Sequence, residues 1–82
     1  MTLEFPNPSR NFDSTRKVVR FVGHDGMFEV PFAVDAQALG GTDEDLCLSA
    51  FDAGRGRIEA AARKIYSRGR KSEYFLSAEN LR

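Results

Sequence analysis

The sequence predicts an α+β fold in which a small antiparallel sheet of three to four strands carries one long amphipathic helix on one face. Two neighbouring apolar stretches, residues 17–23 and 28–34, have the composition of a β-hairpin. Residues 42–69 instead repeat apolar side chains at alternating spacings of four and three, the period of a helix with one buried face. With 82 residues in all, these elements predict a single domain, residues 1–82, with a thin core.

The first residues predict short extended segments rather than a helix. Residues 3–5 form a short strand that Pro6 and Pro8 end, because proline cannot donate to a ladder and restricts the residue before it. Residues 11–12 form a second extended segment. Residues 13–16 form a turn, since Asp and Ser side chains bond to nearby backbone at such positions.

Alternation along the two hairpin strands predicts which face is buried. Successive side chains of a strand point to opposite faces, so every second residue shares one environment. The side chains predicted to face the core are Val19, Phe21, Phe28, Val30, Phe32 and Val34.

Two alternative loops are compatible with the pairing of the two strands. Matching core face to core face pairs Phe21 with Val30, and either a two-residue loop at 25–26 or a four-residue loop at 24–27 satisfies this. Pro31 favours the longer loop, because the shorter one places it in a hydrogen-bonded pair that proline cannot complete. The longer loop also predicts that the strand around Pro31 lies at an edge of the sheet.

Both ends of the predicted 42–69 helix carry the expected signals. Thr42 with Asp45 matches a capping box directly after a Gly-Gly pair, and Gly69 suits the left-handed residue that closes a helix. Acidic residues fill the first turn and basic residues the last, as the helix dipole favours. The stripe predicted to pack on the sheet comprises Cys47, Phe51, Gly54, Ile58, Ala61, Ala62 and Ile65.

Gly54 and Gly56 leave a second interpretation of this helix open. Each costs a helix interior about 1 kcal/mol relative to alanine, so a break at residues 53–56 is the alternative. One continuous helix is preferred because the apolar spacing keeps its phase through Gly54. On this interpretation Gly54 lets the helix backbone approach the sheet closely.

The remaining stretches predict short elements. Residues 35–39 form one helical turn that Asp35 caps and two glycines end. Residues 73–76 form a last strand, and Ser77 caps a short helical tail that runs through Leu81.

The bulk composition argues against several functions. Twelve basic and 12 acidic residues give zero net charge, which disfavours binding of nucleic acid or membrane through the whole surface. The single cysteine, Cys47, cannot form an internal disulfide and is predicted to be buried. The first 20 residues hold no apolar run of a signal peptide or membrane span, so the expected compartment is the cytoplasm.

No motif in the sequence predicts catalysis, a metal or a cofactor. His24 beside Asp25 is a candidate acid–base pair, but neighbours in a turn rarely orient one another, and turn chemistry explains both residues. One histidine and one cysteine are too few for the ligand set of a zinc site. Residues 54–57 repeat Gly-Arg without the context or the Lys-Ser/Thr ending of a phosphate loop.

Residues 55–71 form the main charge feature, with seven basic residues against Glu59 alone, a local net charge of seven minus one, or +6. A solvated helix face whose cations suit the helix C-terminus is the simpler explanation. A surface that binds phosphate is the alternative. Its candidate contacts for an anionic partner are Arg68, Arg70 and Lys71, because they fall where the helix ends and side chains can converge.

The second face of the predicted hairpin is more apolar than a water-facing sheet requires. Two covers remain open for it. One is the N-terminal segment, which would fold Leu3, Phe5 and Phe12 over the sheet, and the other is a second copy of the chain. The apolar residues on this face are Val18, Val22, Met27 and Ala33.

Short patterns along nearly the whole chain resemble those of a known family. They are Phe5-Pro6, Val19-x-Phe21, Asp25-Gly26 before an alternating apolar strand, residues 66–69, and Tyr74-x-Leu76-x-x-x-x-Leu81. They are similar to a family of small uncharacterised bacterial proteins, found mostly in proteobacteria and catalogued as a domain of unknown function. The resemblance implies a compact α+β domain in bacterial cytoplasm, and it carries over no active site.

Three classes of function follow from the sequence, in order of preference. The first is a binding or accessory module that acts through protein–protein contacts or self-association. The second is a binder of nucleic acid or another anionic partner through residues 55–71. An enzyme comes last, because no set of catalytic residues can be assigned.

Overall fold

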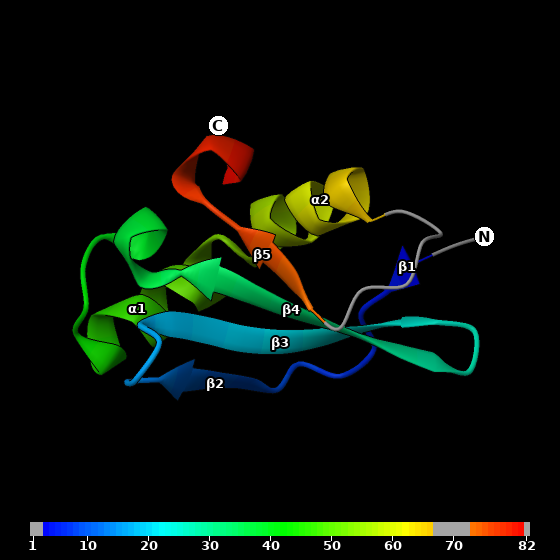
Figure 1. The fold of residues 1–82 in the computed structure, drawn as a ribbon, viewed down its shortest axis with the longest axis horizontal. Helices are drawn as coiled ribbons and strands as arrows, with labels where there is room; N and C mark the ends of the chain where they lie inside the picture. The colour runs from blue at the N-terminus through cyan, green and yellow to red at the C-terminus, as the bar shows by residue number, and fades with distance from the viewer. Residues whose placement is uncertain (1–2, 67–72, 82) are drawn as a thin grey trace.

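A computed structural model describes residues 3–66 and 73–81, and its centre is the hairpin of β3 (Val18–Asp25) and β4 (Phe28–Asp35). On the outer side of β3 lie two short strands, β1 (Leu3–Glu4) and β2 (Arg10–Asp13), both antiparallel to it. On the outer side of β4 lies β5 (Tyr74–Leu76). The result is an α+β fold, as predicted, with the helices gathered on one side of the sheet (Figure 1).

The expectation of a wholly antiparallel sheet is wrong for β5, which runs parallel to β4. The reason is the connection between these two strands. After β4 the chain passes through both α-helices before it returns to the sheet, and such a helical crossover brings the next strand in with the same direction. The sheet is therefore mixed, with an antiparallel majority.

The predicted hairpin register is wrong by two residues. Phe21 lies opposite Phe32 instead of Val30, and the two-residue loop consists of Gly26 and Met27. A shift of two keeps every side chain on its predicted face, so the apolar pattern cannot distinguish the two registers. Gly26 decides between them, because its φ of +63° suits the first loop position of a type II′ turn.

Pro31 stands opposite Val22 in the observed register. Counting alternate pairs from the closing pair of a two-residue loop makes this a non-hydrogen-bonded position, where the missing N–H of proline costs nothing. The predicted edge position does not hold for β4 as a whole, which lies between β3 and β5. The pairing with β5 begins at Phe32, directly after Pro31.

The single helix predicted over residues 42–69 is two helices, α1 (Glu44–Ala53) and α2 (Arg55–Ile65), which meet at Gly54. Gly54 leaves helical geometry, with φ of −105° and ψ of 18°. The N–H of Gly54 still donates a backbone hydrogen bond to the carbonyl of Ala50, and its own carbonyl accepts one from the N–H of Ile58, both at 2.9 Å. The apolar stripe keeps its phase across the break because both helices pack on the same layer of side chains.

The ends of this helical region also differ from the prediction. Asp43, not Thr42, is the N-cap of α1, and its carboxylate accepts a hydrogen bond from the N–H of Leu46 at 3.0 Å. At the other end α2 stops at Ile65, since Tyr66 is extended. The predicted terminator Gly69 lies outside the described residues.

The predicted close approach of Gly54 to the sheet is also wrong. A Cβ at Gly54 would meet the carbonyl of Ala50 at 3.4 Å, within its own helical region, and no atom of the sheet. What holds the junction is the N-terminal segment: Arg10 binds Asp52 at 2.8 Å, and Arg55 reaches both Asp52 at 3.2 Å and the carbonyl of Pro8 at 3.0 Å.

The short elements follow the predictions. Asp35 caps the 3-10 helix Ala36–Leu39, which ends at glycines with φ of 105° and 147°. A second 3-10 helix, Ala78–Leu81, follows Ser77, but the predicted cap is not formed, because the hydroxyl of Ser77 donates to Oδ1 of Asn80 at 3.1 Å. The turn before β3 is built on Asp13, whose carboxylate accepts hydrogen bonds from the N–H groups of Thr15 and Arg16 at 3.0 Å each.

The core lies between the sheet and the two α-helices. Its centre is a chain of aromatic rings in which Phe32 lies 5.2 Å from Phe21 and 5.4 Å from Tyr74, and Phe21 lies 5.1 Å from Phe51 of α1. Of the predicted helix stripe, the side chains of Cys47, Phe51, Ile58, Ala61 and Ala62 are buried. Of the predicted core strand positions, Val19, Phe21, Val30, Phe32 and Val34 are buried, whereas Phe28 is exposed.

Candidate functional site

The candidate contacts for an anionic partner, Arg68, Arg70 and Lys71, lie outside the described residues. In the described part of the basic segment, two arginines are engaged within the chain. Arg55 binds Asp52, and Arg63 donates to the carbonyl of Leu3 at 3.1 Å while its guanidinium lies over the ring of Phe5.

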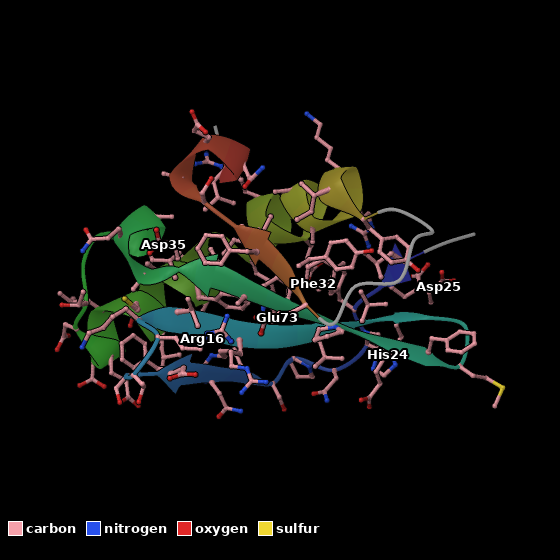
Figure 2. All side chains as sticks on the ribbon, viewed as in Figure 1. Arg16, His24, Asp25, Phe32, Asp35 and Glu73 are labelled. Atoms are coloured by element: carbon pink, nitrogen blue, oxygen red, sulfur yellow. The ribbon has the colours of Figure 1, made fainter. Side chains whose placement is uncertain are left out.

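His24 and Asp25 do not form an acid–base pair. They are consecutive residues of β3, so their side chains leave the strand in opposite directions, as Figure 2 shows. Asp25 is buried and accepts a hydrogen bond from the hydroxyl of Tyr66, whereas His24 is half-buried on the other face of the sheet. Asp25 alone therefore connects the hairpin to the end of α2, and His24 takes no part in this contact.

Cys47 is buried, as predicted, and its sulfur lies 3.1 Å from the carbonyl oxygen of Gly41. Burial raises the pKa of its thiol, which keeps the group protonated and unreactive. Within residues 3–66 and 73–81, no three His, Cys, Asp or Glu side chains come together as metal ligands.

The face of the sheet that points away from the helices is the most distinctive surface, and we call it the outward face. It is seen from the front in Figure 1, with α1 behind the sheet. No helix of the described part of the chain lies over this face. It comprises Glu4, Asn11, Asp13, Val18, Arg20, Val22, His24, Glu29, Pro31, Ala33, Asp35, Glu73 and Phe75, with Arg16 reaching onto it from the turn before β3.

The N-terminal segment does not cover the outward face, so one of the two predicted covers is wrong. Leu3 is buried in the core on the helix side, and the ring of Phe5 lies 6.0 Å from the rings of Phe21 and Phe32 there. Phe12 pairs with the buried Val19 and packs against the same core. These apolar side chains complete the core because helices this short leave the end of the sheet open.

Two arginines and one glutamate cross the middle of the outward face. Both carboxylate oxygens of Glu73 accept hydrogen bonds from Arg16, at 2.6 and 3.2 Å (Figure 2). Arg20 lies 3.7 Å from the same carboxylate. The hydrogen bond from Arg16 is the main reason that the pKa of Glu73 is lowered from its ordinary value.

Two apolar residues of the outward face lie beside these charged side chains and are buried. Val18 and Ala33 point outward yet are 3% and 0% exposed. Arg20 stands directly opposite Ala33, and the aliphatic part of an arginine covers apolar surface while its charged end stays in water. The sequence offered no signal for this arrangement, because Arg16 and Glu73 are 57 residues apart.

Apolar surface remains exposed on both sides of this charged centre. Phe75 projects from β5 with half of its surface exposed, and Val22 and Pro31 are half-buried opposite one another. At the hairpin tip Met27 is 98% exposed and Phe28 64%. Phe75 could have been identified from the sequence, since it lies between two core residues of a strand.

The end of the outward face nearest the hairpin tip is acidic. His24 is flanked across the strands by Glu4 of β1 and Glu29 of β4, and both glutamates are exposed. Neither glutamate forms an ion pair within the described part of the chain. The outward face therefore carries two arginines near its middle and two free carboxylates toward the tip.

Comparison with known proteins gives a family and no function. The sequence model of a family described as "Protein of unknown function (DUF1488)" matches residues 3–77. No curated protein and no solved structure matches the chain. In the described residues, no helix has the length and apolar character needed to cross a membrane.

Proposed function

The chain belongs to DUF1488, a family of proteins of unknown function, and we propose that it is a small binding module that acts through protein–protein contacts. The contact surface is the outward face of the sheet. We place the module in the cytoplasm of bacteria, where a free cysteine such as Cys47 stays reduced.

The observation that carries this proposal is the exposed apolar surface of the outward face. Phe75, Val22 and Pro31 lie on neighbouring strands and surround the cluster of Arg16, Arg20 and Glu73. Aromatic and arginine side chains are the residue types enriched in protein interfaces. A rigid sheet also presents them without the entropic cost of ordering a loop.

Photo-cross-linking tests the proposal in a bacterial lysate. A photoreactive phenylalanine analogue replaces Phe75 in one variant and Leu46 in a matched control, because Leu46 is equally apolar and 64% exposed but lies on α1. We expect protein adducts from position 75 and none from position 46. Equal yields at both positions, or no adduct at position 75, would contradict the proposal.

A second candidate, binding of an anionic partner, is supported by the outer side of α2. Arg57 and Lys64 are exposed and seven residues apart, which places them on the same side of a helix, and the basic segment continues in the sequence with Arg68, Arg70 and Lys71. A phosphate backbone bound there would give affinity that depends on salt and ignores base sequence.

This candidate is tested by binding of single-stranded RNA or DNA at about 50 and about 200 mM salt. Wild type is compared with a variant that carries Arg68→Gln, Arg70→Gln and Lys71→Gln. Binding at the lower salt that the triple variant loses would support the candidate. Absence of binding, or equal binding by both proteins, would remove it.

A further inference from the structure

We propose that the protein that binds the outward face is a second copy of this chain, packed antiparallel and face to face around a twofold axis near Val22 and Pro31. This inference rests on the proposed function, because it uses the same surface. It names the partner of that surface and the way in which the two copies are oriented.

Charges on the outward face are ordered along the strands. Glu4 and Glu29 lie one step from Val22 and Pro31 toward the hairpin tip, and Arg20 lies one step away in the opposite direction. A twofold axis at the middle row exchanges these two ends. It therefore places the glutamates of each copy against Arg20 and Arg16 of the other, twice in each dimer.

The carboxylates of the outward face differ in how they are engaged. Arg16 and Arg20 share the carboxylate of Glu73, at 2.6 and 3.7 Å. Asp13 and Asp35, beyond Arg20, accept backbone hydrogen bonds in their own turns. Glu4 and Glu29 form no ion pair within the described part of the chain, so they are the carboxylates of this face that another molecule can pair with.

An apolar row of Val22 and Pro31 lies on the proposed axis. Val22 and Pro31 are half-buried and stand opposite one another, so two such rows can approach as two sheets do in a sandwich, about 10 Å apart. Phe75 extends the apolar contact along β5. A dimer interface of standard size needs about 800 Å² from each partner, out of the 5236 Å² that this chain exposes.

The net charge of the chain favours this association. A large net charge keeps copies of a protein apart, and this chain has none, with 12 basic and 12 acidic residues. Complementary patches can then act without a background of repulsion.

Charge exchange between two variants tests the orientation directly. Arg20→Glu and Glu29→Arg each place like charges opposite one another in both symmetric contacts of a homodimer. In a mixture of the two variants, every such contact again joins opposite charges. Molar mass is measured by light scattering and sedimentation over roughly a hundredfold range of concentration.

We expect wild type to dimerise and each single variant to weaken the dimer by roughly tenfold or more. The equimolar mixture should recover the dimer. Matched controls are Arg57→Glu on α2 and Glu79→Arg in the 3-10 helix at 78–81, which make the same charge changes on exposed positions off this face. The controls should dimerise as wild type does.

A monomeric wild type at every concentration overturns the inference, as does a dimer that survives both single variants. Loss of the dimer in both variants without recovery in the mixture overturns the antiparallel orientation. Cross-links from position 75 separate this inference from the proposed function. An adduct of twice the chain mass supports both, whereas a different protein on a monomeric chain supports only the proposed function.

Discussion

The two faces of the sheet are built from the same strands but differ in the side chains that shield their apolar residues from water. On the helix side, neighbouring aromatic rings lie 5.1 to 6.0 Å apart and are buried by α1, α2 and the N-terminal segment. On the outward face, Val18 and Ala33 are equally buried, but long charged side chains stand beside them.

Burial alone therefore does not locate the core of so small a protein. A ring packed among other rings loses many contacts when it is removed, since the surroundings relax only partly. A residue covered by the aliphatic parts of arginine side chains loses fewer contacts, because flexible side chains can close over the gap. The two faces should therefore respond differently to the same substitution.

The largest effect is expected from truncation of an aromatic ring on each face. Phe32→Ala should lower the free energy of unfolding by about 3–5 kcal/mol, because Phe32 is fully buried among three other rings. Phe75→Ala on the outward face should cost less than about 1 kcal/mol. Urea denaturation of both variants measures this, and similar losses would show that the faces are energetically alike.

The next largest effect on stability is expected from a methyl group added on the helix side of the sheet. In Gly23→Ala the new Cβ would lie 2.9 Å from the ring of Phe5 and 3.0 Å from Leu3. Crowding of this kind costs about 1–3 kcal/mol. Thermal unfolding measures it, and a second substitution, Leu3→Ala, should relieve part of the crowding; no loss of stability in Gly23→Ala would contradict the packing described.

The two glycines of the helical region should respond more weakly, and Gly56 in a favourable direction. Gly56 has open space around its Cβ position in α2, so Gly56→Ala should stabilise by about 0.4–1 kcal/mol. Gly54→Ala should change stability by less than this, because its backbone is allowed for alanine and the nearest atom is 3.4 Å away. A loss of more than about 1 kcal/mol at Gly54 would show that the junction needs glycine.

The smallest effect concerns the pH dependence of the outward face. The bond from Arg16 lowers the pKa of Glu73 from its ordinary 4.5, so the ionised carboxylate stabilises the folded state above that pH. This contribution is lost as the pH falls through the lower folded pKa. Glu73→Gln should therefore lose less stability than wild type between about pH 7 and about pH 3, as thermal unfolding at each pH measures; parallel curves would contradict the ion pair.

Local chemistry was predicted well from the sequence. The Asp35 cap of the first 3-10 helix, the turn at Asp13 and the buried positions Val19, Phe21, Phe51 and Ile58 each depend on a few neighbouring residues. The break at Gly54 was only one of two alternatives. The constant phase of the apolar spacing favoured the continuous helix, which is wrong. Two helices that pack on the same layer of side chains keep that phase as easily as one continuous helix does.

The candidate surface was predicted only in part. The apolar residues Val18, Val22 and Ala33 were placed on the outward face from alternation alone. The charged side chains beside them were not predicted, because the pairing of Arg16 with Glu73 joins residues from the two ends of the chain. No local pattern predicts which of 12 basic residues will meet which of 12 acidic ones.

The sequence by itself determined the period of each element, and so which side chains face the core and which face outward. Only the tertiary structure decided the hairpin register, the parallel direction of β5 and the side on which Leu3 and Phe5 pack. The reason is the range of the interactions. Periodicity acts between residues two to four positions apart, whereas register and strand direction are set by contacts between segments whose separation in the sequence leaves no pattern.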